Sequence, residues 1–248
     1  MKYSKKLFNK IKITTDMLDY NVGNILRGDF NTTNDPYIEK NRKNLCYNKK
    51  YENTILGIYF RNSLIKKKLY SASYSGLILK LSIDKYIKQN IKNIKLPSPD
   101  ELVVYFRLGD QLLHLNKMGC ELFYNYKEQI NNKLKSNNYK KITIVTNLAF
   151  CGVKKHSDII DDNIKDGVFY KSFQSKGSCE YSEKNINFNK LMFLPVLDDI
   201  IDSFPEYKID IFSSYNPDHD ICYLYKNGFI GDNRSTWFRI FNYNKKIV

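Results

Sequence analysis

Two clusters of polar residues in the second half of the chain carry the side chains best suited to chemistry. The first is Arg107 to Asp110, where the sequence Arg-Leu-Gly-Asp directly follows an apolar run. An arginine presents a planar set of N–H donors that matches the oxygens of a phosphate group. Gly109 allows the backbone to turn sharply beside a ligand. The alternative interpretation is that Arg107 and Asp110 form an ion pair that braces the end of a strand.

The second cluster lies within residues 216–238. The carboxylate of Asp220 accepts two hydrogen bonds, which suits the pair of N–H groups on a guanine edge. The loop that runs to Ser235 precedes an apolar segment, so that backbone amides and the hydroxyls of Ser235 and Thr236 would cradle a phosphate at a helix start. The alternative is that Asp218 caps one short helix and Ser235 or Thr236 caps the next. The two roles are compatible.

Other kinds of catalytic or metal site find little support. The three histidines, His114, His156 and His219, lack the spacing of metal ligands, and the five cysteines form no C-x-x-C pair. Neither a P-loop nor a dinucleotide-binding fingerprint is present in the sequence. The sequence therefore predicts no metal site and no bound cofactor.

The elements that must position the two clusters follow from the apolar pattern. Segments with the length of buried strands are 102–106, 141–146, 208–212 and 228–230, with a further short strand expected at 55–60. Helical spacing predicts a helix from about residue 71 that ends before Pro97, one through Tyr126 and Ile130, one with Pro195 in its first turn, one at 218–225 and one at 237–241. Strands that alternate with helices predict an α/β fold with a Rossmann-like parallel sheet.

The two clusters are expected to meet at one edge of this sheet. Arg107 and Asp110 follow the first strand, Asn147 follows the second, residues 216–220 follow the third, and 232–235 follow the last. Ligands of open parallel sheets bind outside the carboxyl ends of the strands. The sequence therefore predicts a binding site formed by these four strand ends.

The Leu-Pro-Ser-Pro segment at 96–99 is the predicted domain boundary, between a small N-terminal region at 1–98 and a Rossmann-like domain at 99–248. No apolar segment has the length of a signal peptide core or of a membrane span, and the unpaired cysteines favour a reducing compartment. We therefore expect a cytoplasmic location, in the producing or host cell, and no membrane span.

The net charge of +14 invites a nucleic-acid interpretation. Only six of the 40 basic residues are arginines, and the lysines are scattered among Asn, Ile and Tyr, which share A/T-rich codons. A nucleic-acid footprint would gather basic residues on one face. We therefore attribute the excess to genome composition and expect no nucleic-acid partner, with a basic nucleic-acid-binding protein kept as an alternative.

Three patches give the chain a resemblance to the fucosyltransferase superfamily (α1,2-, α1,6- and protein O-fucosyltransferases), and most closely to glycosyltransferases of large DNA viruses. They are Tyr-Phe-Arg-Leu-Gly-Asp at 105–110, the strand that ends at Asn147, and the Asp-x-x-aromatic-Leu segment from Asp220 that leads through an apolar strand to Ser235 and Thr236. The likeness covers roughly residues 100–245. The order and spacing of the three patches agree with the family pattern.

The resemblance implies a GT-B-like architecture, with residues 1–98 as a reduced N-terminal α/β part on the acceptor side and residues 99–248 as the nucleotide-sugar-binding domain. It also implies inverting, metal-independent transfer from a nucleotide sugar, with GDP as the expected nucleotide, to a glycan or protein acceptor. By position, Arg107 would hold the β-phosphate, Asp220 the base, and Ser235 with Thr236 the phosphates, with Asp110 near the acceptor hydroxyl. Binding residues are also expected at Gly109, Asn147, Asp218 and Arg234.

Departures from the family pattern keep other functions open. Tyr105 stands where the family usually has His, and Leu108 where many members have a second Arg. These departures motivate the alternative of a catalytically degenerate relative that acts as a binding module. Another group transfer on a Rossmann layer, such as sulfo or methyl transfer, is a further alternative. The sequence leaves the donor sugar, the acceptor and the oligomeric state open.

Overall fold

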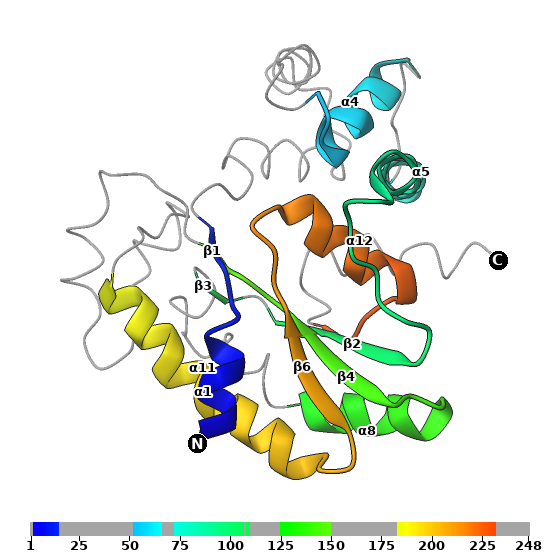
Figure 1. Cartoon of the computed structure of the whole chain (residues 1–248). Helices are drawn as coiled ribbons and strands as arrows, with labels where there is room; N and C mark the ends of the chain where they lie inside the picture. Colours follow the sequence, from blue (N-terminus) through cyan, green and yellow to red (C-terminus); the bar gives the residue numbers. More distant parts are fainter. Residues whose placement is uncertain are drawn as a thin grey trace.

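A computed structural model describes residues 2–14, 52–65, 72–106, 108–109, 125–149 and 183–231. The strands are β1 (Ile13–Thr14), β2 (Glu101–Tyr105), β3 (Leu108–Gly109), β4 (Lys141–Val145), β5 (Leu148–Ala149) and β6 (Lys208–Phe212). The helices are α1 (Lys2–Phe8), α4 (Ile55–Ile65), α5 (Ala72–Asn90), α8 (Tyr126–Ser136), α11 (Glu183–Ser203) and α12 (Pro217–Asn227) (Figure 1).

A three-stranded parallel sheet in the order β2-β4-β6 forms the centre of the described part. Its strands fall where the sequence predicts them, and the last predicted strand is present as a parallel bridge between Ile230 and Val104. Helix α8 connects β2 to β4, and α11 connects β4 to β6. The mixed α/β class with a parallel sheet is confirmed, and it is compatible with a Rossmann-like fold.

The short strands β3 and β5 continue β2 and β4, and the residue pairing between the two chain segments keeps the same register. Tyr105 pairs with Val145 at the end of β2 and β4, and Leu108 pairs with Leu148 in β3 and β5. Both pairs are separated by 40 residues in sequence. β5 pairs with β3 on one side and with β1 on the other, where Ile13 pairs with Leu148. β1 therefore lies beyond the end of β6, on the same side of the β4–β5 line. The sheet therefore extends past residues 106 and 146 toward its carboxyl edge.

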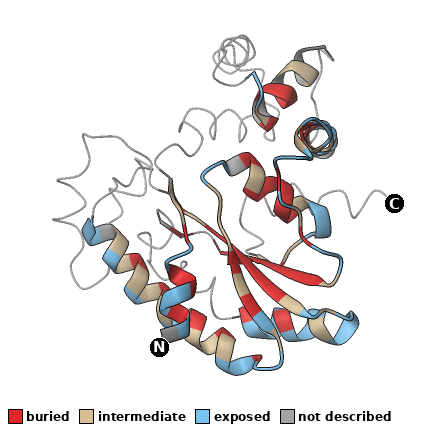
Figure 2. Cartoon of the chain, viewed as in Figure 1, coloured by how far each residue is buried: buried red, intermediate tan, exposed pale blue. Residues whose placement is uncertain are grey.

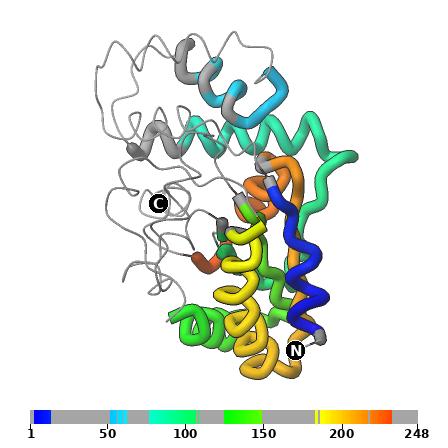
Figure 3. The backbone as a smooth tube through the Cα atoms, turned by 90° about the vertical axis from the view of Figure 1, so that its left-hand side faces the viewer, coloured from blue at the N-terminus to red at the C-terminus, as the bar shows by residue number. Residues whose placement is uncertain are grey.

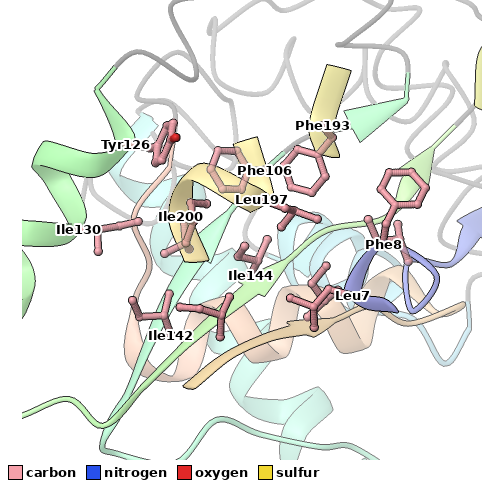
Figure 4. Close-up of a cluster of buried hydrophobic side chains, with 14 of the residues drawn as sticks. Leu7, Phe8, Phe106, Tyr126, Ile130, Ile142, Ile144, Phe193, Leu197 and Ile200 are labelled. Carbon is pink, nitrogen blue, oxygen red and sulfur yellow. The ribbon is translucent and has the colours of Figure 1, made fainter. Parts of the chain in front are cut away.

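The strands alternate between two covered faces. Leu102, Val104, Ile142 and Ile144 point into a cluster with Leu7 and Phe8 of α1, Tyr126 and Ile130 of α8, and Phe193, Leu197 and Ile200 of α11 (Figure 4). The intervening Val103 and Val145 pack against Tyr223 and Leu224 of α12. Figure 2 shows β2 and β4 buried along most of their length, while β6 alternates between buried and more exposed residues. Each fully buried Ile or Phe contributes about 1.5–3 kcal/mol to folding, so this layer supplies a stable base for its carboxyl edge.

Two helices stand outside this layer. α4 packs on α5, and α5 packs on α12 (Figures 1 and 3). Ile55, Ile58 and Tyr59 of α4 are buried, as are Leu79 and Ile83 of α5, so the helix pair has an apolar interior of its own. The helix expected from about residue 71 is confirmed, with its end at Asn90 ahead of Pro97.

Two predicted elements differ from the structure. Residues 55–60, expected as a strand, begin α4, whose start is capped by the Thr54 hydroxyl accepting the Gly57 N–H. Pro195, expected in a first turn, lies inside α11, which begins at Glu183. The apolar face of α11 carries Phe193 and Leu197 across the proline, and burial of this face outweighs the hydrogen bond that the proline cannot donate.

Residues 2–14 belong to the sheet layer by contact, since α1 packs on α11 and β6, and β1 pairs with β5. The division at residue 98/99 stays a prediction. No helix among the described residues is long and apolar enough to span a membrane. The predicted helix at 237–241 lies outside the described residues.

Candidate functional site at the carboxyl edge of the sheet

The carboxyl end of β2 lies beside the Ile230 segment. The Tyr105 N–H donates to the Ile230 carbonyl at 2.7 Å, and the Ile230 N–H donates to the Val103 carbonyl at 2.9 Å. β4 and β6 lie on the other side of β2, so the order of the sheet reverses between β2 and Ile230. Open parallel sheets bind ligands where the strand order reverses in this way.

Asp220 links the segments that follow β4 and β6. It lies in the first turn of α12, after β6, and its Oδ2 accepts a hydrogen bond from Asn147 Nδ2 at 2.9 Å. Its Oδ1 accepts one from the Ser214 N–H at 3.0 Å. Asn147 follows β4, so these contacts bring together side chains that are 73 residues apart in sequence. The predicted convergence of Asn147 with the 216–220 segment is confirmed.

The burial of Asp220 favours its uncharged form. Only 6% of the residue is exposed. Burial raises the pKa of Asp220 to about 8, although the hydrogen bonds from Asn147 and Ser214 act in the opposite direction. At neutral pH the side chain is therefore mostly protonated, and its O–H is a donor in addition to the two hydrogen bonds that its oxygens accept.

Asp218 lies two residues earlier in the same turn and faces a different element. Its Oδ2 accepts a hydrogen bond from the Ile55 N–H, the first residue of α4, at 3.3 Å. Burial raises the pKa of Asp218 to about 6, and the bond from Ile55 opposes this shift. A carboxylate at a helix N-terminus is also favoured by the helix dipole. Asp218 therefore links α12 to α4.

The helix cap predicted for Asp218 is supplied by Asn216. The Asn216 Oδ1 accepts the Asp218 N–H at 3.0 Å, and the Asn216 Nδ2 donates to the Tyr86 hydroxyl of α5 at 3.3 Å. Burial, followed by the charge of Asp218, raises the pKa of Tyr86 to about 12, so this hydroxyl stays protonated. Burial lowers the pKa of His219, whose ring lies 6.5 Å from that of Tyr86. At neutral pH the site side of α12 therefore carries one mostly ionised carboxylate, Asp218, beside groups that are mostly uncharged.

The other predicted site residues have different outcomes. Gly109 lies in β3 and pairs with Ala149, so the backbone there is a strand and not the sharp turn that the sequence predicts. Predicted residues that lie outside the described residues are Arg107, Asp110, Arg234, Ser235 and Thr236.

Sequence reasoning missed Ser214, Ile55 and Tyr86 as neighbours of this edge. Ser214 contributes its backbone N–H, which any residue type supplies. Tyr86 falls on the buried face of α5 with Leu79 and Ile83, and that spacing was the available indication. The contact of Ile55 with Asp218 depends on tertiary packing alone.

Within the described ranges, no three His, Cys, Asp or Glu side chains are grouped to hold a metal ion. No family model, curated protein or solved structure matches the chain. Interpretation of the site therefore depends on its geometry and on the sequence motifs.

Proposed function

We propose that the protein is an inverting, metal-independent glycosyltransferase with a GT-B-like architecture that uses a GDP-linked sugar. The observation that supports this best is the hydrogen bond between Asn147 and Asp220 at the carboxyl edge, where two predicted ligand-binding residues meet. Arg107 follows β2 in sequence, and the 232–236 segment follows the Ile230 bridge. Both segments thus continue from strands that flank the switch point.

In this proposal the base and the diphosphate are held by different parts of the edge. Asp220 binds the N–H pair of guanine, and Arg107 binds the β-phosphate together with Ser235, Thr236 and the backbone amides before them. Negative charge grows on the departing diphosphate in the transition state. A preorganised guanidinium stabilises that charge more in the transition state than in the ground state, which is how such a site accelerates transfer.

The acceptor would approach from the side of Asp110, on the segment that follows β3 in sequence. Inversion needs an acceptor oxygen in line with the departing diphosphate and a base to take its proton. Asp110 is the proposed group near that hydroxyl. The proposed features are thus GDP as the donor nucleotide, Asp110 on the acceptor side and inverting transfer, and the identity of the sugar is left open.

Titration calorimetry with GDP tests the assignment of Arg107. Arg107→Ala should weaken GDP binding at least tenfold, or about 1.4 kcal/mol, with folding nearly unchanged. Arg61→Ala is the matched control, because Arg61 lies in α4 and donates to the Glu52 carbonyl. Equal GDP affinities for the wild type and Arg107→Ala would refute the role of Arg107.

A thermal-shift panel of GDP, UDP, ADP and their sugars tests the donor class. Stabilisation by GDP and GDP-sugars above the other nucleotides is expected, since only a ligand that binds the folded state raises the melting temperature. Absence of any nucleotide effect would reject the proposed function. Binding of GDP-sugars without transfer or hydrolysis would favour the degenerate binding module.

A further inference from the structure

The first turn of α12 contacts both the ligand edge and the α4–α5 helix pair. On the sheet side, Asp220 accepts from Asn147. Two residues earlier, Asp218 accepts from the Ile55 N–H. Figure 1 shows α12 between the sheet and α5, with α4 beyond α5, and Figure 3 gives the same order from the side. One helical turn thus joins two parts of the molecule that have separate apolar interiors.

The contact at Asp218 is well placed to control the start of α4. Thr54 caps this helix through Gly57, which leaves the Ile55 N–H without a partner inside α4. Asp218, itself only 8% exposed, accepts that N–H. A buried donor that loses its acceptor is destabilising, because it has also lost its contact with water. The first turn of α4 therefore depends on the position of Asp218.

A single helical turn transmits displacement because its backbone is held by internal hydrogen bonds. The carboxyls of Asp218 and Asp220 are attached to the same turn, and Asn216 caps it. Both carboxyl groups are therefore positioned by the same turn, Asp220 against Asn147 and Asp218 against Ile55.

We propose that this turn couples the ligand edge to α4, so that occupation of the Asp220 site fixes the first turn of α4 and loss of the Asn147–Asp220 bond loosens it. The proposal deepens the function proposed above and rests on it for the identity of the ligand. It assigns to Asp218 a positioning role, acting through Ile55. The stability of the first turn of α4 then depends on whether a ligand occupies the carboxyl edge of the sheet.

Hydrogen exchange of the α4 amides at residues 55–57 tests the coupling without any ligand. Asn147→Ala should raise their exchange rate at least threefold. Asn227→Ala is the matched control, because it removes an asparagine at the opposite end of α12, where Nδ2 donates to the Ser98 carbonyl at 2.6 Å. The control should leave these amides at the wild-type rate. If Asn147→Ala does not fold, Asn147→Ser provides the same comparison.

The coupling would be overturned if the amides at 55–57 exchanged at the wild-type rate in Asn147→Ala. It would also be overturned if their exchange rose equally in Asn227→Ala, and neither result depends on whether GDP binds. A second measurement adds GDP to the wild type and expects slower exchange at the same amides. Absence of GDP binding together with the Asn147→Ala effect would count against the proposed function and leave the coupling standing. GDP binding that leaves the α4 amides unchanged would overturn the coupling and leave the function standing.

Discussion

Buried carboxyl groups lie at both ends of the parallel sheet, but their pKa values are shifted in opposite directions. At the amino end, Glu101 begins β2 and is only 4% exposed, yet it has a cation, since Lys141 Nζ lies 3.3 Å from its Oε1. The Tyr223 hydroxyl also donates to Glu101. Burial would raise the pKa of Glu101, but hydroxyl hydrogen bonds and the charge of Lys141 outweigh burial and lower it.

At the carboxyl end, Asp220 and Asp218 are similarly buried but have only amide donors. Among the described residues, no Lys or Arg forms an ion pair with either carboxyl, and burial raises both pKa values. Structural carboxylates are usually paired when they are buried. Within the described part of the chain, the amino end therefore pairs its buried carboxylate with a cation, while the carboxyl end holds two buried carboxyl groups with raised pKa values.

The largest expected effect lies at the amino end. Glu101→Ala should lower the free energy of unfolding by about 3 kcal/mol, because it leaves a partly buried Lys141 and the Tyr223 hydroxyl without their acceptor. Lys141 retains Asp210 at 3.7 Å, which keeps the loss near the lower end of the usual range. Urea unfolding at pH 7 measures it. Asp220→Asn is the comparison and should change stability by less than about 0.5 kcal/mol, since the amide resembles the neutral acid. Equal losses would show that the two ends do not differ.

The pH dependence of stability should have opposite signs at the two ends. The folded pKa of Glu101 is lowered, so its stabilisation is present at neutral pH and is lost as pH falls through the folded pKa. The pKa of Asp220 is raised to about 8, so the folded protein holds a proton that the unfolded chain has lost. Stability should therefore fall by about 1.4 kcal/mol between pH 7 and pH 9. Unfolding curves of the wild type and Asp220→Asn across this range measure the difference, and parallel curves would contradict the prediction.

Nucleotide affinity should change with the same proton. In the proposed function guanine offers two donors to Asp220, so GDP binding would require the charged carboxylate. The apparent affinity for GDP should rise about tenfold from pH 7 to pH 9, as a pKa of about 8 requires, with release of a proton on binding. Calorimetry in two buffers of different ionisation enthalpy counts that proton. A pH-independent affinity would place the base elsewhere.

The smallest effect compares the two ends of α12. Asn216→Ala removes the N-cap and should cost about 1 kcal/mol. Asn227→Ala removes the bond to the Ser98 carbonyl and should cost about 0.5–1 kcal/mol. Thermal unfolding measures both. The losses are similar, but only Asn216→Ala removes a contact with α5, through Tyr86. Limited proteolysis should therefore cleave α5 faster in Asn216→Ala than in Asn227→Ala. Equal cleavage rates in the two variants would argue against this difference.

The central sheet was predictable because β2 and β4 are short apolar runs buried on both faces, as Ile144 and Val145 illustrate. Residues 55–60 were assigned wrongly because a short apolar run with an aromatic residue suits a strand as well as a buried helix. The pairing of Ile13 with Leu148 spans 135 residues for two residue pairs, and no local pattern encodes it.

The candidate site was predictable only in part. The position of Asn147 directly after a strand predicted its meeting with the 216–220 segment, because parallel strands end at one edge. The uncharged state of Asp220 was not predictable, since it depends on how deeply tertiary packing buries the residue. The link from Asp218 to Ile55 likewise depends on where α4 docks.

The constant offset of 40 residues between the β2–β3 and β4–β5 strands restricts how this protein can change in length. Inserting one residue between Phe106 and Leu108 would shift β3 against β5 and turn its side chains to the opposite face, unless a residue were also inserted between Val145 and Leu148. Insertions at these two places should therefore occur in pairs among evolutionary descendants. A loop graft at either place would need a compensating change at the other.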